Sequence, residues 1–123
     1  MNHLDYLVEL KVSPAATVPT PQEGIAFTER FVLPTIEACE RHAAEGRIVA
    51  GGPTLAGLSF AFVARVATPQ ELERLVSGLP IWPRAQTTVT PLGSFSERGA
   101  NVRQRLAAIK GSLAGTADVA TRN

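Results

Sequence analysis

The same four residues, Thr-Pro-Gln-Glu, occur twice in this chain, at residues 20–23 and 68–71. In each copy the threonine can cap a helix, the proline suits the first helical position, and the glutamate can reach back to the cap amide. Each copy follows a segment with the alternating pattern of a half-buried strand. The repeat therefore predicts two units in which a strand leads into a helix.

Four segments have the composition of β-strands. Residues 4–12 and 58–66 alternate apolar side chains with others, and residues 86–92 are rich in threonine. Residues 47–50 form a short apolar run, which Gly51-Gly52-Pro53 is expected to break. The second and third of these strands along the chain are predicted to form a hairpin.

Two helices are predicted between these strands. The first begins at residue 21 and is expected to end at Gly46, which suits a left-handed C-cap. Pro34 lies inside it and lacks a backbone N–H, so it should kink or split the helix. The second helix opens at residue 69 and stops at Gly78.

The resulting order, β-α-β-β-α-β, predicts an α+β fold of the ferredoxin-like type, with a four-stranded antiparallel sheet and both helices on one face. At 123 residues the chain suffices for one core. We assign residues 1–95 to this domain. Residues 96–123 are assigned to a C-terminal helix, strongest over 98–111, and a tail that docks on a neighbouring subunit.

The face of the sheet without helices is expected to be too apolar for water. It should carry the residues Leu7, Ala61, Val63 and Val89 beside Glu9, Ser59 and Arg65. Packing this face against the same face of a second subunit would cover it and enclose a cavity. The sequence thus predicts a homodimer, or a larger ring, built as a dimeric α+β barrel.

Composition and motifs exclude several classes of function. Twelve basic and eleven acidic residues occur without a basic cluster, so neither nucleic acid nor a membrane is an expected partner. The two histidines lie far apart and no phosphate-binding loop is present, so neither a metal nor a cofactor is expected. Cys39 is interpreted as a buried thiol. Without a signal-peptide pattern, the predicted location is cytoplasmic.

Glu9 is the candidate catalytic residue, because it is a carboxylate in the middle of an otherwise apolar strand. Removal from water raises the pKa of a carboxyl group and a nearby cation lowers it. With Arg65 near it, Glu9 could be tuned to move a proton inside the cavity. The alternative is that Glu9 makes a structural ion pair.

Four residues are candidates for substrate contact. Ser59 and Arg65 are expected on the same face as Glu9. Trp82 and Arg84 lie in a proline-rich segment that leads into the last strand, and they could form the rim of the cavity. Alternatively, the Trp82 ring simply plugs the end of the barrel.

This proline-rich segment also carries a family resemblance. The sequences LPIWP at residues 79–83 and VTPL at 89–92 resemble the LPLFP and VTAL stretches of the muconolactone isomerases. QEL at residues 70–72 and LVEL at 7–10 resemble that family's QEL and its first-strand hVEM. The spacing runs without a gap from residue 46 to 92, so the resemblance covers most of the domain.

The resemblance implies a dimeric α+β barrel, often assembled into rings, that isomerises an unsaturated lactone by moving a proton without a cofactor. Glu9 matches the family's strand-one glutamate. The second strand departs from the family, because IVAGGP at residues 48–53 stands where the enzymes have Trp, Arg and His. This change favours a substrate that is less charged than muconolactone.

The leading prediction is therefore a cofactor-independent isomerase, or a diverged lyase or cyclase, in which Glu9 moves a proton on a small carbonyl compound. A binding or assembly module without catalysis is one alternative. A cofactor-free monooxygenase or a YCII-like protein is another, since one fold supports several chemistries.

Overall fold

The computed structural model describes residues 2–12, 20–55 and 57–122. The chain divides into two compact units, Met1–Leu92 and Gly93–Asn123, which are described separately. In the part of the chain that is described, the first unit contains four strands, three α-helices, a π-helical turn and a short 3-10 helix, and the second contains one helix.

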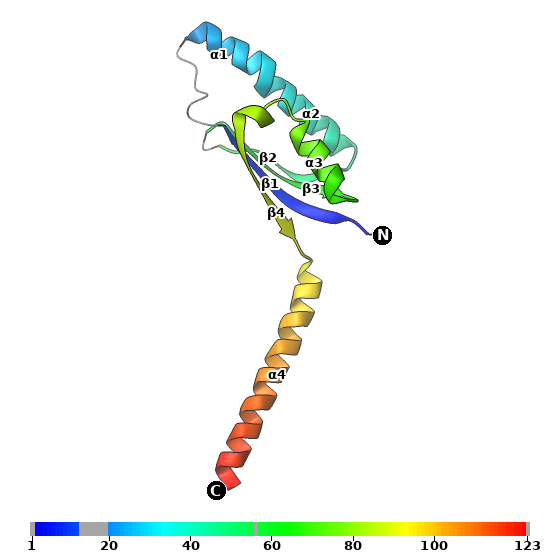
Figure 1. Ribbon diagram of the computed structural model, residues 1–123, viewed down its shortest axis with the longest axis vertical. Helices are drawn as coiled ribbons and strands as arrows, with labels where there is room; N and C mark the ends of the chain where they lie inside the picture. The colour runs from blue at the N-terminus through cyan, green and yellow to red at the C-terminus, as the bar shows by residue number, and fades with distance from the viewer. Residues whose placement is uncertain (1, 13–19, 56, 123) are drawn as a thin grey trace. The chain divides into compact units, whose positions relative to one another are not determined.

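The sheet of the first unit is antiparallel and open. Its strands are β1 (Leu4–Val12), β2 (Ile48–Pro53), β3 (Ser59–Val66) and β4 (Ala85–Leu92). They are arranged in the order β2-β3-β1-β4, so β1 lies inside the sheet and β4 forms one edge (Figure 1). This α+β architecture is consistent with the ferredoxin-like arrangement that the order of elements predicts.

Strand β2 is longer than predicted, because it continues through the Gly-Gly-Pro sequence to Pro53. Gly51 has a φ of 115°, and a Cβ atom there would lie 2.3 Å from the carbonyl oxygen of Ala61. The missing side chain lets β2 approach β3 closely, so these residues extend the strand. The prediction that they end it is wrong.

Three α-helices precede or connect the strands: α1 (Pro21–Phe27), α2 (Leu33–Ala44) and α3 (Pro69–Ser77). The threonines of the two repeated sequences cap α1 and α3 as predicted, but the Glu71 carboxylate accepts a hydrogen bond from Ala67 N, at 2.9 Å, and not from the cap amide. Thr20 Oγ1 accepts a hydrogen bond from Glu23 N, and Thr68 Oγ1 accepts one from Glu71 N, both at 3.1 Å. Beyond α2, Gly46 adopts a φ of 81° and ends the helix as expected.

The interruption predicted at Pro34 takes the form of a π-helical turn, η2 (Thr28–Val32), between α1 and α2. The amide of Leu33 bonds to Thr28 O, five residues back, immediately before the proline. A wider turn at this point accommodates a residue that has no N–H to donate. The three segments nevertheless follow one another as a continuous rod in Figure 1.

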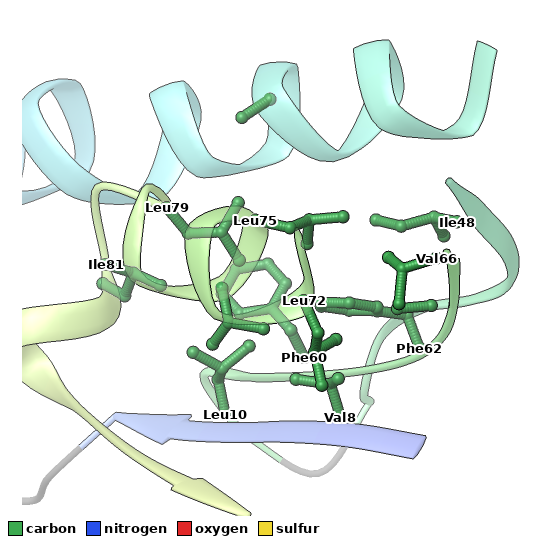
Figure 2. Close-up of a cluster of buried hydrophobic side chains, with 13 residues drawn as sticks. Val8, Leu10, Ile48, Phe60, Phe62, Val66, Leu72, Leu75, Leu79 and Ile81 are labelled. Atoms are coloured by element: carbon green, nitrogen blue, oxygen red, sulfur yellow. The ribbon is translucent and has the colours of Figure 1, made fainter. Parts of the chain in front are cut away.

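The core lies between the sheet and the helices α2 and α3, which cover the same face (Figure 1). Val8 and Leu10 of β1 are fully buried and point toward Leu72 of α3, as Figure 2 shows. Phe60 and Phe62 of β3 join the same cluster. The alternation predicted for β1 and β3 is therefore confirmed.

The expected position of Val89 is wrong. Val89 pairs with the buried Val8, so it lies on the helix side of the sheet. Thr88 and Thr90, opposite Glu9 and Leu7, lie on the free face instead. A strand places successive side chains on opposite faces, so the pairing of Glu9 with Thr88 puts Val89 on the face opposite to the expected one.

The second unit is the helix α4 (Phe95–Arg122), which is longer at both ends than the predicted segment 98–111. Ser94 precedes it, and Ser94 Oγ accepts a hydrogen bond from Glu97 N at 2.9 Å. This side chain satisfies one of the free amides of the first turn, which places the start of the helix before Arg98.

A buried hydroxyl joins the helical rod to the segment that follows α3. Thr35 is fully buried, and its Oγ1 donates to Phe31 O at 2.7 Å and accepts from Ile81 N at 2.9 Å. Ile81 is itself fully buried, so no water can replace Thr35 as the partner of this amide.

We expect Thr35→Val to lower the free energy of unfolding by about 1–3 kcal/mol, because it leaves the buried Ile81 amide without an acceptor. Thr35→Ser is the matched control: it keeps the hydroxyl and loses one methyl, at a cost of about 1 kcal/mol or less. Urea denaturation measures both. A valine variant as stable as the serine variant would contradict the structural role of the hydroxyl.

Candidate functional site

The helix-free face around Glu9 is built from alternate residues of β1, β3 and β4. In the pairing register, Glu9 lies between Ala61 of β3 and Thr88 of β4. The next pair toward the start of β1 places Leu7 between Val63 and Thr90. The carboxylate thus occupies the middle of this face, with Ala61 and Thr88 beside it and with Leu7 and Lys11 two residues away along β1.

The Glu9 side chain is half-buried, and within the described residues it makes no hydrogen bond and no ion pair. The alternative that Glu9 serves as a structural ion-pair partner therefore finds no support within one chain. Lys11, two residues along on the same face, pairs with Ser59 and Gln86 in the register.

Arg65 does not pair with Glu9. Its Nε and Nη2 donate to the two carboxylate oxygens of Asp5, at 2.9 Å and 3.1 Å. Asp5 is four residues before Glu9 in β1, about 13 Å away at the usual strand rise. The expectation that Arg65 tunes Glu9 is wrong, because Asp5 lies directly opposite Arg65 in the register.

This ion pair has an electrostatic consequence. The hydrogen bond from Arg65 and, less strongly, its positive charge hold the pKa of Asp5 below the ordinary value. Both side chains keep substantial contact with solvent, which screens their interaction. The pair leaves little net charge at this end of the helix-free face.

The other predicted contact residues are separated by the sheet. Ser59 lies on the helix-free face, where its hydroxyl is hydrogen-bonded to the Thr54 hydroxyl. Arg84, at the end of the 3-10 helix η3 (Trp82–Arg84), places its guanidinium 5.2 Å from the centre of the Phe31 ring. Trp82 borders a cavity beneath α3. Within one chain, therefore, neither Trp82 nor Arg84 joins Glu9.

A cavity of about 200 Å³ lies between α2 and the strands β2 and β3. Its walls are mainly apolar and include Cys39, Gly51 and Phe62, with Glu40 also contributing. Burial raises the pKa of the Cys39 thiol, which disfavours the nucleophilic thiolate. This cavity therefore offers an apolar volume without an activated nucleophile.

His42 makes a structural contact rather than a catalytic one. Its Nδ1 accepts a hydrogen bond from Arg47 Nε at 3.1 Å. Partial burial and then the charges of Arg47 and Arg41 lower its pKa. The neutral imidazole thus satisfies an arginine that follows the end of α2.

Sequence reasoning missed Thr87, whose Oγ1 is buried without a hydrogen-bond partner among the described residues. It lines the same cavity as Trp82. The signal was available in the alternation of residues 86–92, since placing Thr88 beside Glu9 turns Thr87 toward the helices.

Within residues 2–12, 20–55 and 57–122, no three His, Cys, Asp or Glu side chains gather as metal ligands would. None of the helices in this described part has the length and hydropathy needed to cross a membrane. In comparisons with known proteins, no family model matches the sequence, and no curated protein matches it significantly.

The Asp5–Arg65 pair predicts a pH effect with a defined sign. Because the folded-state pKa of Asp5 is lowered, the pair stabilises the fold above about pH 4 and loses this effect as the pH falls through the folded pKa. Arg65→Met should raise the pKa of Asp5 in an NMR titration and reduce stability at neutral pH only. An unchanged Asp5 midpoint in the variant would refute the assignment; Asp5→Asn is the control for the stability difference.

Proposed function

We propose that this protein is a cofactor-independent isomerase that moves a proton on a small unsaturated lactone or related carbonyl compound, with Glu9 as the base. The observation that carries the proposal is the Glu9 carboxylate, which has no partner among the described residues and lies between Ala61 and Thr88. The resemblance to muconolactone isomerases, in which Glu9 matches the strand-one glutamate, supports the same role.

The proposal includes a homodimer formed through the helix-free face. Leu7, Ala61 and Val63 are only half-buried within one chain. A second sheet would cover these side chains, a gain of about 25 cal/mol for each Å² of apolar surface removed from water. It would also enclose Glu9 in a cavity, giving the dimeric α+β barrel.

The proposed reaction needs one group that both accepts and donates a proton. Glu9 removes a proton from the carbon next to the carbonyl, and the electrons of that C–H bond delocalise into the conjugated system. The protonated Glu9 then returns the proton to a different carbon, which shifts the double bond. No oxidant, reductant or cofactor takes part, because the substrate and product are isomers.

Two cations of the helix-free face bear on the charge of the substrate, Arg65 and Lys11, and Lys11 has no ion-pair partner among the described residues. Arg65 is occupied by Asp5, so it cannot act as a free partner for a substrate carboxylate. The hydroxyl groups of Thr88 and Thr90 are suited to hydrogen-bond a lactone carbonyl instead. A neutral unsaturated lactone therefore fits the surroundings of Glu9 and Thr88, whereas muconolactone, which carries a carboxylate, would need Lys11 as its cationic partner.

The test is proton exchange and isomerisation of muconolactone and a panel of neutral unsaturated lactones, followed by NMR in deuterated buffer. We expect deuterium to enter at least one neutral lactone with the unaltered protein, and Glu9→Gln to reduce the rate at least about 100-fold, the usual contribution of a general base. Glu37→Gln, on the exposed side of α2, is the matched control and should leave the rate unchanged.

Equal rates for Glu9→Gln and Glu37→Gln would remove Glu9 from the mechanism. No exchange with any lactone of the panel would favour the second candidate, a module that binds or assembles without catalysis.

The helix α4 provides the specific observation for an assembly role. A row of apolar side chains is exposed along it, comprising Phe95, Val102, Leu106, Ile109 and Leu113. Their spacing of seven, four, three and four residues places them on one side of the helix. Such a row is expected to pack against another surface.

The charges beside this row indicate what that surface carries. Arg98 and Arg105 flank it on one side, and Arg103 and Lys110 flank it on the other. Residues 93–123 contain five basic and two acidic residues, whereas residues 1–92 contain seven basic and nine acidic residues. Like charges oppose pairing of two α4 helices, so we propose that α4 docks on the first unit of a neighbouring copy.

Light scattering after size-exclusion chromatography separates the two proposed contacts. Val63→Asp places a charge on the helix-free face and should reduce the dimer to a monomer, whereas Leu106→Asp should abolish larger assemblies and leave the dimer. Gln104→Asp, on the opposite side of α4 from the apolar row, is the control for added charge. A molar mass that none of these variants changes would refute both contacts.

A further inference from the structure

A second cavity lies on the helix side of the sheet, between α3 and the edge strand β4. It has a volume of about 280 Å³. Its lining includes Leu72, Glu73, Val76, Trp82, Thr87 and Val89. The volume is close to the lower end of the range of small-molecule sites, about 300 Å³, and suits a ligand with a single ring.

One polar group in the wall of this cavity lacks a partner. Thr87 Oγ1 is buried, and no hydrogen bond reaches it within the described residues. Buried hydroxyl groups are nearly always hydrogen-bonded, because their desolvation is otherwise uncompensated. Thr87 lines the cavity, so rotation about χ1 to another staggered position can turn its hydroxyl toward a ligand that supplies the missing partner.

The rest of the lining is suited to a flat ring. Leu72 and Val76 are buried and give the cavity an apolar floor. Trp82, the only tryptophan of the chain, leaves 42% of its surface exposed beside the cavity. An indole that borders an apolar cavity offers a broad face on which an aromatic ring can stack.

Glu73 determines which charge the ligand can carry. Its carboxylate has no ion-pair partner among the described residues, and Glu73 contributes to the cavity wall. An unpaired carboxylate attracts a cation or a hydrogen-bond donor and repels an anion. The cavity thus combines an apolar floor, an aromatic wall, a free hydroxyl group and one negative charge.

We propose that this cavity binds a flat aromatic ring that carries a cationic or neutral hydrogen-bonding group. Thr87 and Thr88 are successive residues of a strand, so the Thr87 cavity and the Glu9 face lie on opposite sides of the sheet. The proposed ligand site therefore requires neither the dimer nor the activity of Glu9. Failure of the isomerase proposal would therefore leave the proposal of this ligand site unaffected, and the reverse also holds.

Benzamidine, benzamide and benzoate test the proposal, because they share one ring and differ mainly in a charge of plus one, zero or minus one. The full-length protein is labelled with nitrogen-15, and the single indole N–H signal, from Trp82, reports binding to this cavity. We expect benzamidine to bind at least about threefold more tightly than benzamide, and benzoate to bind most weakly, as expected for a partly exposed charge.

Two substitutions test the polar groups separately. Glu73→Gln should abolish the preference for benzamidine over benzamide, whereas Glu37→Gln, away from the cavity, should preserve it. Thr87→Val should weaken benzamide about threefold to tenfold, the usual value of one hydrogen bond. Thr90→Val, on the opposite face of the same strand, is its matched control.

Thr87→Val has a second expected effect that a merely structural threonine would not show. Because it removes an unpartnered buried hydroxyl, the variant should unfold at the same urea concentration as the unaltered protein or a higher one, although it binds benzamide less well. The proposal is overturned if benzamidine leaves the indole signal unmoved up to its solubility limit. It is equally overturned if benzoate binds as tightly as benzamidine, or if Thr87→Val and Thr90→Val bind benzamide alike.

Discussion

The position of β1 inside the sheet determines where each candidate functional side chain of the first unit lies. Val8 and Leu10 are fully buried under the helices, so Glu9 between them must face the other way. A shift of one residue in the pairing would bury the carboxylate in the core and expose two apolar side chains. Burial of Val8 and Leu10 therefore fixes Glu9 on the helix-free face. It also fixes Thr88 opposite Glu9, and it turns Thr87 toward α3.

Two successive residues, Pro34 and Thr35, determine how the helical layer is held in place. Pro34 cannot donate a backbone hydrogen bond, and the π-helical turn before it accommodates that loss. Thr35, the next residue, uses its hydroxyl both to bond within this helix and to accept the buried amide of Ile81. The segment that contains Ile81 leads directly into η3, and η3 begins at Trp82. The irregular turn before Pro34 and the hydrogen bond from Ile81 N to Thr35 thus help to position Trp82, which borders the α3–β4 cavity.

The sequence predicted those features that depend on local chemistry. Thr20 and Thr68 cap their helices, and the alternation in β1 gives the correct face for Glu9. It failed where geometry between strands decides the outcome. The Gly-Gly-Pro sequence predicts a break at Gly51, but the close approach of β3 makes glycine the residue that allows β2 to continue. Likewise, the partner of Arg65 depends on register, which places Asp5 opposite it, and no pattern within either strand reveals that pairing.

The separation of Glu9 from Trp82 limits which residues could line the cavity of the proposed dimer. The sequence predicts both residues around one ligand, but β4 directs Thr88 toward Glu9 and Thr87 toward the cavity that Trp82 borders. A small ligand on one face cannot touch both, because the pleated sheet lies between them. The substrate of the proposed isomerase must therefore be held by residues of the helix-free face, mainly apolar groups and the hydroxyls of threonine. Selection on that face rests on shape, on neutral hydrogen bonds and on the charge of Lys11, whereas Glu73 gives the opposite face a preference for positive charge.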